Sequence, residues 1–322
     1  MPHLSAAQQS QFEREGYVVV EDVFDPEREL DPVIEEYDGV LDTLATELLE
    51  SGAISSTYPE LAFSDRLARI YAETGKVYPK YFDLSLPQRG VTHQTPFWTG
   101  PAVFALLRSK GVLDRVESLI GPEIYSNPVQ HIRLLPPERL VPTDPSTGRA
   151  LLAATPWHQD NGVVTEEADD TEMITVWLPL LDTTEEMGCL VVQPGSHRRG
   201  LLTHCGGGRL HVPDQLVGAA AGTPLPMACG SALFMHRRTL HSSLPNRSNQ
   251  VRRSFDLRYH PTGQPTGRPA FPGFVARSKS RPDTELRDPE MWTAMWLEAR
   301  RALADSDQPR FNRWDANAAV CA

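Results

Sequence analysis

The stretch Trp157-His158-Gln159-Asp160 decides how the rest of this 322-residue sequence is interpreted. On an extended strand, residues i and i+2 point to the same side, so His158 and Asp160 can both reach one metal ion. Two ligands do not make a site, and His-x-Asp triplets are common by chance. A third ligand is needed, and His241 is the candidate. Two histidines and one carboxylate on one face of an octahedron are typical of a non-haem Fe(II) site with three open positions.

Such an iron site needs a co-substrate that delivers electrons to dioxygen. 2-Oxoglutarate does so by chelating iron through its C1 carboxylate and C2 ketone, which leaves a distal carboxylate to be held. A planar bidentate cation suits that carboxylate. Arg252 lies eleven residues after His241, at the start of a predicted strand, and Ser243 could donate its hydroxyl to the same carboxylate. The sequence therefore predicts Fe(II) as the metal, with 2-oxoglutarate and dioxygen as co-substrates.

The hydrophobic pattern of the sequence differs before and after Gly121. After Gly121, short apolar runs alternate with turn residues, a spacing typical of a β-sandwich or barrel; the runs are 129–135, 173–181, 189–192, 231–235 and 254–259. Before Gly121, helical spacing predominates apart from a short β-branched strand at 17–20; the predicted helices cover 5–15, 27–51, 64–75 and 102–120. A further helix is predicted over about 289–304. We interpret the whole as one β core wrapped by helices.

These motifs, in this order, resemble the phytanoyl-CoA dioxygenase family of Fe(II)/2-oxoglutarate-dependent oxygenases. The resemblance rests on residues 158–160, on the run Gly-Cys-Leu-Val-Val-Gln-Pro-Gly-Ser-His at 188–197, and on residues 241–252. The opening pattern Phe-x-x-x-Gly-Tyr-Val-Val-Val at 12–20 also matches, so most of residues 5–260 is covered. The resemblance implies a double-stranded β-helix (jelly-roll, cupin-like) core with iron at one open end.

The resemblance also implies site residues. His158, Asp160 and His241 would ligate iron, and Arg252, assisted by Ser243, would anchor 2-oxoglutarate. The remaining carry-overs are Gln130, on the strand facing 2-oxoglutarate, and Trp177, in the wall of its pocket. The expected fold is mainly β with helical wrapping. We expect a single oxygenase domain over 1–322, with a mainly helical region at 1–121, the β-helix core at 122–262 and a C-terminal extension with a helix at 263–322.

Other residues compete for these roles. His236, five residues before His241, is a rival third ligand, although the family pattern puts the ligand directly before the Ser-Ser-x-Pro-Asn turn. Alternation along 252–259 puts Arg252 and Arg258 on one face and Arg253 on the other. Parity therefore excludes Arg253 if Arg252 faces the co-substrate, but only the spacing to His241 separates Arg252 from Arg258. His197, in a Pro-Gly-Ser-His turn, is expected to bond to backbone.

The predicted reaction is hydroxylation of an unactivated C–H bond of a small molecule, in natural-product metabolism, with release of succinate and CO₂. Asp160 favours a hydroxylase over a halogenase, which has a small residue at the carboxylate's position. Desaturation, epimerisation or ring formation stay open, as does a lid function for the loop at 161–171. Two alternatives are a cupin-like metalloenzyme that uses no 2-oxoglutarate and a non-catalytic jelly-roll binding protein with a vestigial metal site.

Composition limits the partners. The 31 Lys and Arg against 42 Asp and Glu give a net charge of −11, which disfavours nucleic acid and, mildly, a polyanionic substrate such as a CoA thioester. No apolar run approaches the roughly 18 residues of a membrane span, and no signal peptide is recognised at the N-terminus. The four cysteines lack CxxC spacing and predict no disulfide framework. We therefore expect a cytoplasmic monomer or homodimer that binds a small-molecule substrate.

Overall fold

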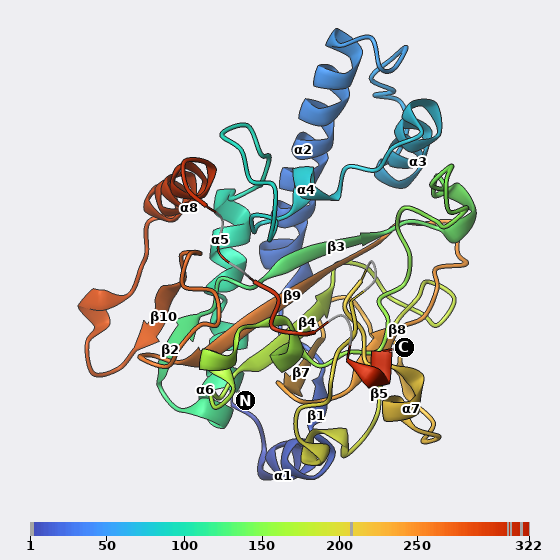
Figure 1. Ribbon diagram of the computed structural model, residues 1–322. Helices are drawn as coiled ribbons and strands as arrows, with labels where there is room; N and C mark the ends of the chain where they lie inside the picture. The colour runs from blue at the N-terminus through green and yellow to red at the C-terminus, as the bar shows by residue number, and fades with distance from the viewer. Residues whose placement is uncertain (1–2, 207–208, 308, 310, 316–317, 322) are drawn as a thin grey trace.

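The computed structural model describes residues 3–206, 209–307, 309, 311–315 and 318–321. Its core is a pair of antiparallel sheets (Figure 1). The larger sheet has the order β1-β7-β4-β9-β2-β10, and β3 also pairs with β9. Its strands are β1 (Tyr17–Val20), β2 (Glu123–Ser126), β3 (His131–Leu135), β4 (Ile174–Pro179), β7 (Ala232–His236), β9 (Arg252–Pro261) and β10 (Phe274–Ser278). The smaller sheet, β6-β5-β8, consists of β5 (Leu190–Val192), β6 (Thr223–Leu225) and β8 (His241–Ser243). The double-stranded β-helix fold is confirmed.

The predicted helices form, with one correction. Ser5 caps α1 (Ala6–Glu15) and Gly16 ends it in the left-handed conformation, as predicted. The single helix predicted over 102–120 is wrong, because α5 (Pro101–Leu107) and α6 (Lys110–Ile120) are separate. Ser109 has a non-helical backbone, with φ −49° and ψ 127°, and donates its hydroxyl to Glu29 at 2.6 Å, which interrupts the helical path. The other helices of four or more residues in the described chain are η1 (Pro26–Leu30, a π-turn), α2 (Asp31–Glu50), α3 (Phe63–Thr74), α4 (Pro79–Phe82), α7 (Asp214–Val217), α8 (Pro289–Ala304) and the 3₁₀ turns η3 (Asp160–Val163) and η5 (Ser196–Arg199).

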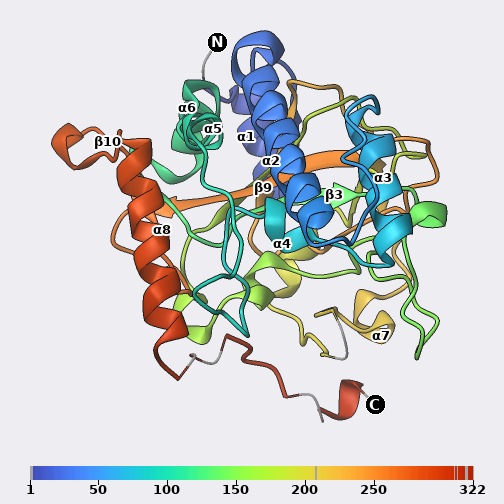
Figure 2. The ribbon, with the colours of Figure 1, turned by 90° about the horizontal axis from the view of Figure 1, so that it is seen from above.

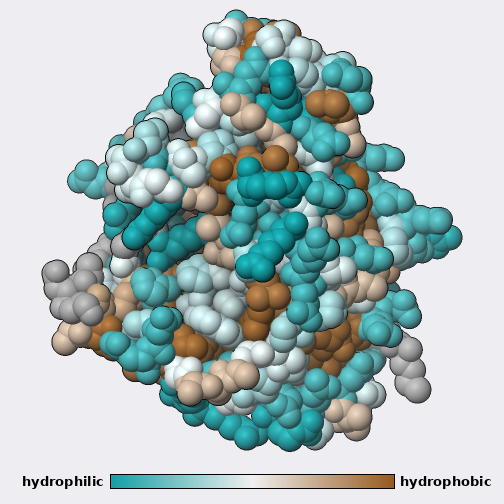
Figure 3. Space-filling view, turned by 90° about the vertical axis from the view of Figure 1, so that its right-hand side faces the viewer, coloured by the Kyte–Doolittle hydropathy of each residue, from teal (hydrophilic) through white to brown (hydrophobic). Residues whose placement is uncertain are grey.

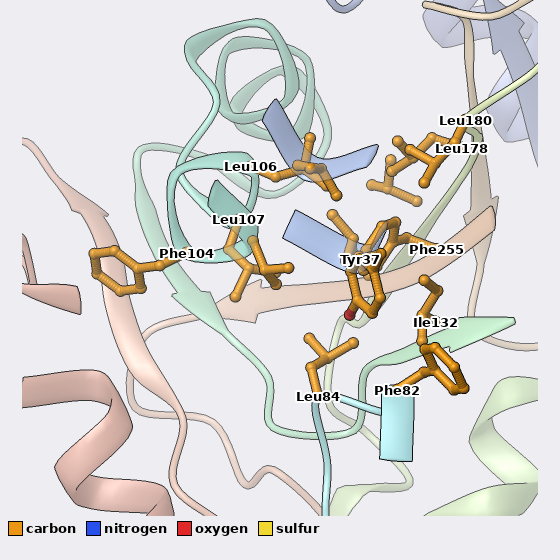
Figure 4. Close-up of a cluster of buried hydrophobic side chains, with 14 of the residues drawn as sticks. Tyr37, Phe82, Leu84, Phe104, Leu106, Leu107, Ile132, Leu178, Leu180 and Phe255 are labelled. Atoms are coloured by element: carbon orange, nitrogen blue, oxygen red, sulfur yellow. The ribbon is translucent and has the colours of Figure 1, made fainter. Parts of the chain in front are cut away.

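The helices before residue 121 cover the outer face of the larger sheet, and α2 crosses it near β9 and β3 (Figure 2). Tyr37 of α2 lies 5.9 Å from the ring of Phe255 on β9 and 6.5 Å from that of Phe82 on α4 (Figure 4). All three side chains are fully buried. Removing this much apolar surface from water is the dominant stabilising contribution to such a core, and it holds β9 by its outer face.

Because one face of β9 belongs to that core, the other face is directed into the β-helix. Phe255, Leu257 and Tyr259 pack outward among the core residues. Arg253 is also outward, since it lies 3.5 Å from Asp38 of α2 and 4.7 Å from the Phe63 ring. Arg252, Ser254, Asp256 and Arg258 therefore share the inner face. The predicted alternation along this strand is confirmed.

The cysteines correct a second expectation. Cys205 and Cys321 form a disulfide, whereas Cys189 and Cys229 are free. The two bonded residues are 116 positions apart, so their spacing carries no sequence signal. They meet because the chain after α8 returns to the loops of the smaller sheet (Figures 1 and 2).

Polar side chains cover most of the molecular face in Figure 3, with apolar patches small and separate. Within the described residues, no helix has both the length and the apolar character that crossing a membrane requires.

Candidate metal centre

His158, Asp160 and His241 come together at one end of the β-helix. Each offers one ligand atom, and the three atoms lie within 4.8 Å of one another. The two imidazole centroids are 4.1 Å apart, and His158 Nε2 is 3.9 Å from Asp160 Oδ1. A backbone bridge sets this geometry, since the amide of each histidine donates to the carbonyl of the other at 2.9–3.0 Å. His158 thus extends the smaller sheet beside β8.

Both histidines are oriented by a second hydrogen bond. His158 Nδ1 lies 2.9 Å from the Pro156 carbonyl and His241 Nδ1 lies 3.0 Å from the Thr239 carbonyl. A carbonyl only accepts, so each Nδ1 carries the proton and each Nε2 is left as a free ligand. Such a partner on the far nitrogen is the usual support of a metal-binding histidine. Two neutral imidazoles and a carboxylate are a donor set that fits Fe(II).

Asp160 is held by two neighbouring strands. The Arg258 guanidinium of β9 forms a buried ion pair with Oδ1, and the Thr175 hydroxyl of β4 donates to Oδ2. Thr175 and Arg258 are direct partners in the β4–β9 register, which is why both reach one carboxylate. Thr175 was not predicted from the sequence. It lies two residues before Trp177 and therefore on the same face of β4, which was a usable signal.

The protonation states suit metal binding. Burial, with His241 beside it, lowers the pKa of His158 to about 3, so the ring is neutral near pH 7. Burial acts to raise the pKa of Asp160, but the charge of Arg258, assisted by the hydrogen bond from Thr175, outweighs it and holds that pKa well below its usual range. At Asp160 and His158 the site therefore presents an anionic oxygen and a neutral nitrogen without any proton having to leave first.

Arg252 stands at the other end of the inner face of β9. It is 2 % exposed, yet within the described chain it has no carboxylate within 4 Å, and its Nε has no hydrogen-bond partner. Its contacts are the Gly188 carbonyl, 2.5 Å from Nη1, and the face of Trp177, 5.7 Å from the guanidinium carbon. Burial lowers the pKa of Arg252 to about 10. An unsatisfied buried cation is costly, so this one calls for an anionic ligand.

Three predicted co-substrate residues remain, namely Ser243, Trp177 and Gln130. Ser243 is buried on β8, and its hydroxyl oxygen accepts from the Thr155 amide at 2.8 Å, so its own proton is available to a ligand. Trp177 lies against Arg252, and its place in the wall of a co-substrate pocket stays a prediction. Gln130 is just outside β3 and donates to Ser126 Oγ at 2.9 Å, while its buried Oε1 has no partner within the described residues. Its role toward a co-substrate stays a prediction.

The rival residues have other partners. His236 accepts from the Arg238 amide through Nδ1 at 3.1 Å and lies outside the ligand cluster. His197 Nε2 lies 3.2 Å from the Glu13 carbonyl, which agrees with the predicted bond to backbone. The geometry thus brings His241, the third ligand that the family pattern favoured, together with His158 and Asp160.

Comparison with known proteins extends these observations. The family model described as phytanoyl-CoA dioxygenase matches residues 12–254, which is most of the chain. A probable phytanoyl-CoA dioxygenase of Caenorhabditis elegans is 27% identical over 179 residues, covering 53% of this chain and 55% of that protein. An L-proline trans-4-hydroxylase of Streptomyces griseoviridis is 32% identical over 154 residues, covering 40% and 57%. The chain spans little more than half the length of these relatives.

A solved structure agrees over more of the chain. The non-haem monooxygenase ThoJ, in its apo form, superimposes with a TM-score of 0.59 over 92% of this chain and 96% of its own, at 16% identity. At that identity the likeness concerns the fold alone.

Proposed function

The chain belongs to the phytanoyl-CoA dioxygenase family of Fe(II)/2-oxoglutarate-dependent oxygenases, and we propose that it hydroxylates an unactivated C–H bond of a small organic molecule. The overall reaction is R–H + O₂ + 2-oxoglutarate → R–OH + succinate + CO₂. The observation that carries the proposal is the convergence of two free Nε2 atoms and one carboxylate within 4.8 Å.

In this proposal His158, Asp160 and His241 hold the iron. The bound iron supplies dioxygen activation, with 2-oxoglutarate as the source of two electrons. The protein side chains do little acid–base work. The Pro156 and Thr239 carbonyls fix the two imidazole tautomers, while Arg258 and Thr175 hold the carboxylate in its ionised form.

Arg252 binds the distal carboxylate of 2-oxoglutarate, and Ser243 donates its hydroxyl to the same group. The support is the buried guanidinium without an ion-pair partner and a serine proton with no acceptor within the described chain. Trp177 excludes water from this end, since it is 1% exposed and lies against the guanidinium. Low local polarity strengthens the charge-assisted bond that a carboxylate would form there.

One oxygenase domain is proposed for residues 1–322. A single apolar cluster includes Leu4, Tyr37, Phe255, Trp296 and Phe311, so the N-terminal helices, the sheet and the C-terminal region share one core. The substrate is proposed to be a small metabolite of the kind that L-proline trans-4-hydroxylase is named for, because the net charge of −11 disfavours a polyanionic thioester.

The test combines substrate-stimulated succinate release with ¹⁸O₂. Hydroxylation predicts one labelled oxygen in succinate and label in the product alcohol. Label in succinate with a product lacking two hydrogens would support the iron chemistry and overturn hydroxylation in favour of desaturation. Folded, Fe(II)-loaded protein that turns over no 2-oxoglutarate with any member of a broad metabolite panel would contradict the enzyme assignment and favour a binding protein.

A further inference from the structure

We propose that a C-terminal clamp positions the segment at 158–160, which carries two of the metal ligands, and that the Cys205–Cys321 disulfide fastens this clamp. The clamp consists of Phe311, Arg313, Trp314 and Cys321. The inference rests on the proposed metal site. Sequence reasoning gave no role to either cysteine or to the segment after α8. The structure brings them to both sides of Asp160.

The first connection runs through Gln159, the residue between the two ligands. Its backbone amide donates to His204 Nε2 at 3.0 Å. Its side chain donates to the carbonyls of Gly200 and Arg238 at 2.9 and 2.8 Å, and its Oε1 accepts from the Leu202 amide at 2.7 Å. The segment at 158–160 is therefore tied to the loop at 200–205.

The burial and the tautomer of His204 suit its hydrogen bond with the Gln159 amide. It is fully buried, and its Nδ1 lies 2.8 Å from the Leu202 carbonyl, which requires a proton on Nδ1 and leaves Nε2 as the acceptor. The next residue is Cys205, which is covalently joined to Cys321. The imidazole also stacks on the Trp314 indole at 5.0 Å with an interplanar angle of 28°. The clamp thus holds His204 by a covalent bond next to it and by an aromatic contact.

The second connection reaches the other side of Asp160. Trp314 Nε1 donates to the carbonyl of Gly162, two residues after the ligand, at 2.7 Å. The fit is close, because a Cβ on Gly162 would lie 2.2 Å from the His204 ring. Gln159 and Gly162 flank Asp160, so Trp314 and His204 together fix the backbone on both sides of it.

Arg313 and Phe311 hold the same segment against the loop that follows. Arg313 makes a bidentate ion pair with Asp169, with N–O distances of 2.5 and 3.0 Å, and its side chain is 9% exposed. Arg268 Nη1 donates to the Phe311 carbonyl at 2.9 Å. The Asp169 side chain is 37% exposed, so the pair is only partly buried, but its bidentate geometry fixes the relative orientation of the two side chains. The loop at 161–171 is thereby fixed to the clamp.

A positioning role and a purely packing role predict different results. If the segment only packs, loosening it lowers the melting temperature and leaves the ligand geometry alone. If it positions the segment at 158–160, metal affinity changes as well, because residues that orient metal ligands typically contribute about 10- to 100-fold to affinity.

The experiment uses the full chain and Co(II) as a coloured probe metal. Peptide mapping without reductant first identifies the Cys205–Cys321 bond. Co(II) titrations then compare wild type with Cys321→Ser, Cys205→Ser and Trp314→Phe, while Cys229→Ser, at a free cysteine, is the matched control. Hydrogen exchange of residues 158–171 is measured on the same metal-free proteins. Trp314→Phe retains an aromatic ring that can stack on His204 and removes the indole N–H that donates to Gly162, together with part of the ring surface.

We expect either disulfide variant to weaken Co(II) binding about 10- to 100-fold, to alter its visible spectrum and to speed exchange in 158–171. Trp314→Phe should do so to a smaller extent, and Cys229→Ser should match wild type. Unchanged Co(II) affinity and unchanged exchange in both disulfide variants, whatever their melting temperatures, would overturn the clamp. If wild type binds no Co(II), the proposed metal site fails, while the exchange data still test the clamp.

Discussion

Two buried arginines on the same face of β9, six residues apart, differ in what surrounds them. Arg258 has an anionic partner in Asp160 and a second acceptor in the Val129 carbonyl. Arg252 has one carbonyl and the face of an indole, but no anionic partner within the described residues, whereas the Nε atom is unpaired in both arginines. Both are 2% exposed, so solvent does not compensate either one.

The difference teaches what each cation does. A buried ion pair with good geometry fixes its partner, and removing one member leaves an uncompensated charge. Arg258 therefore fixes a metal ligand in the free protein. A buried cation without an anion raises the free energy of the folded state until a ligand supplies one. We therefore propose that Arg252 acquires its anionic partner only when a ligand binds.

The largest expected effect comes from breaking the Arg258 end. Asp160→Ala should abolish Fe(II)-dependent activity and lower the free energy of unfolding by about 3–5 kcal/mol, because Arg258 is left buried without its partner. Urea unfolding of the metal-free proteins measures this. Asp160→Ala combined with Arg258→Met should regain most of the stability without regaining metal binding. A loss below about 1 kcal/mol in the single variant would contradict the assigned pairing.

At Arg252 we expect the opposite pattern, in which a substitution preserves stability and impairs 2-oxoglutarate binding. Arg252→Leu should leave the stability of the ligand-free protein unchanged or raise it, because an unpaired buried charge is removed. The same change should raise the KM for 2-oxoglutarate by about 30-fold or more, since truncating one partner of a buried charge pair costs about 2 kcal/mol or more. Arg253→Leu, at the outward neighbour, is the matched control and should leave that KM near the wild-type value.

Lowering the pH tests whether His158, at the Arg258 end of β9, and His204 are neutral in the folded protein. In the metal-free folded chain the pKa of His158 is about 3 and that of His204 about 4, both lowered chiefly by burial. The unfolded chain takes up these protons near pH 6.5. The free energy of unfolding should therefore fall as the pH drops from about 6.5 towards 4, by up to about 1.4 kcal/mol per pH unit for each such histidine. Urea unfolding at pH 7, 6 and 5 measures it. A flat profile would mean that these rings are not neutral and buried.

The smallest effect is expected at Ser243. Ser243→Ala removes one proposed hydrogen bond to 2-oxoglutarate and one observed bond from the Thr155 amide. A single such bond contributes about 0.5–1.5 kcal/mol, so the KM for 2-oxoglutarate should rise about 2- to 10-fold. Ser242→Ala, one residue earlier with opposite parity on β8, serves as the comparison. Equal effects of the two changes would assign Ser243 a structural role only.

The sequence predicted the Arg252 end of β9 better than the Arg258 end. Strand alternation along β9 correctly put Arg253 on the face opposite Arg252 and Arg258, and the spacing to His241 favoured Arg252 over Arg258. The partner of Arg258 could not be predicted in that way, because it depends on the register that sets Thr175 opposite Arg258. Register between β4 and β9 joins residues far apart in the chain and leaves no local pattern.

The same limit applies elsewhere in the fold. The cap at Ser5 and the end at Gly16 are local signals, and α1 has those bounds. The break between α5 and α6 depends on the contact of Ser109 with Glu29, eighty residues away in sequence. The Cys205–Cys321 bond and the Trp314–Gly162 contact, which span more than a hundred residues, are likewise tertiary. Residues that act through such contacts were the ones missed.

The most direct test of the central claim is an anaerobic titration of the Fe(II)-loaded protein with 2-oxoglutarate, followed by the visible metal-to-ligand charge-transfer band. The account predicts a saturable band in wild type, none in His241→Ala, and in Arg252→Leu a band that needs about 30-fold more 2-oxoglutarate to saturate. No band in folded wild-type protein, or the same titration midpoint in Arg252→Leu as in wild type, would contradict it.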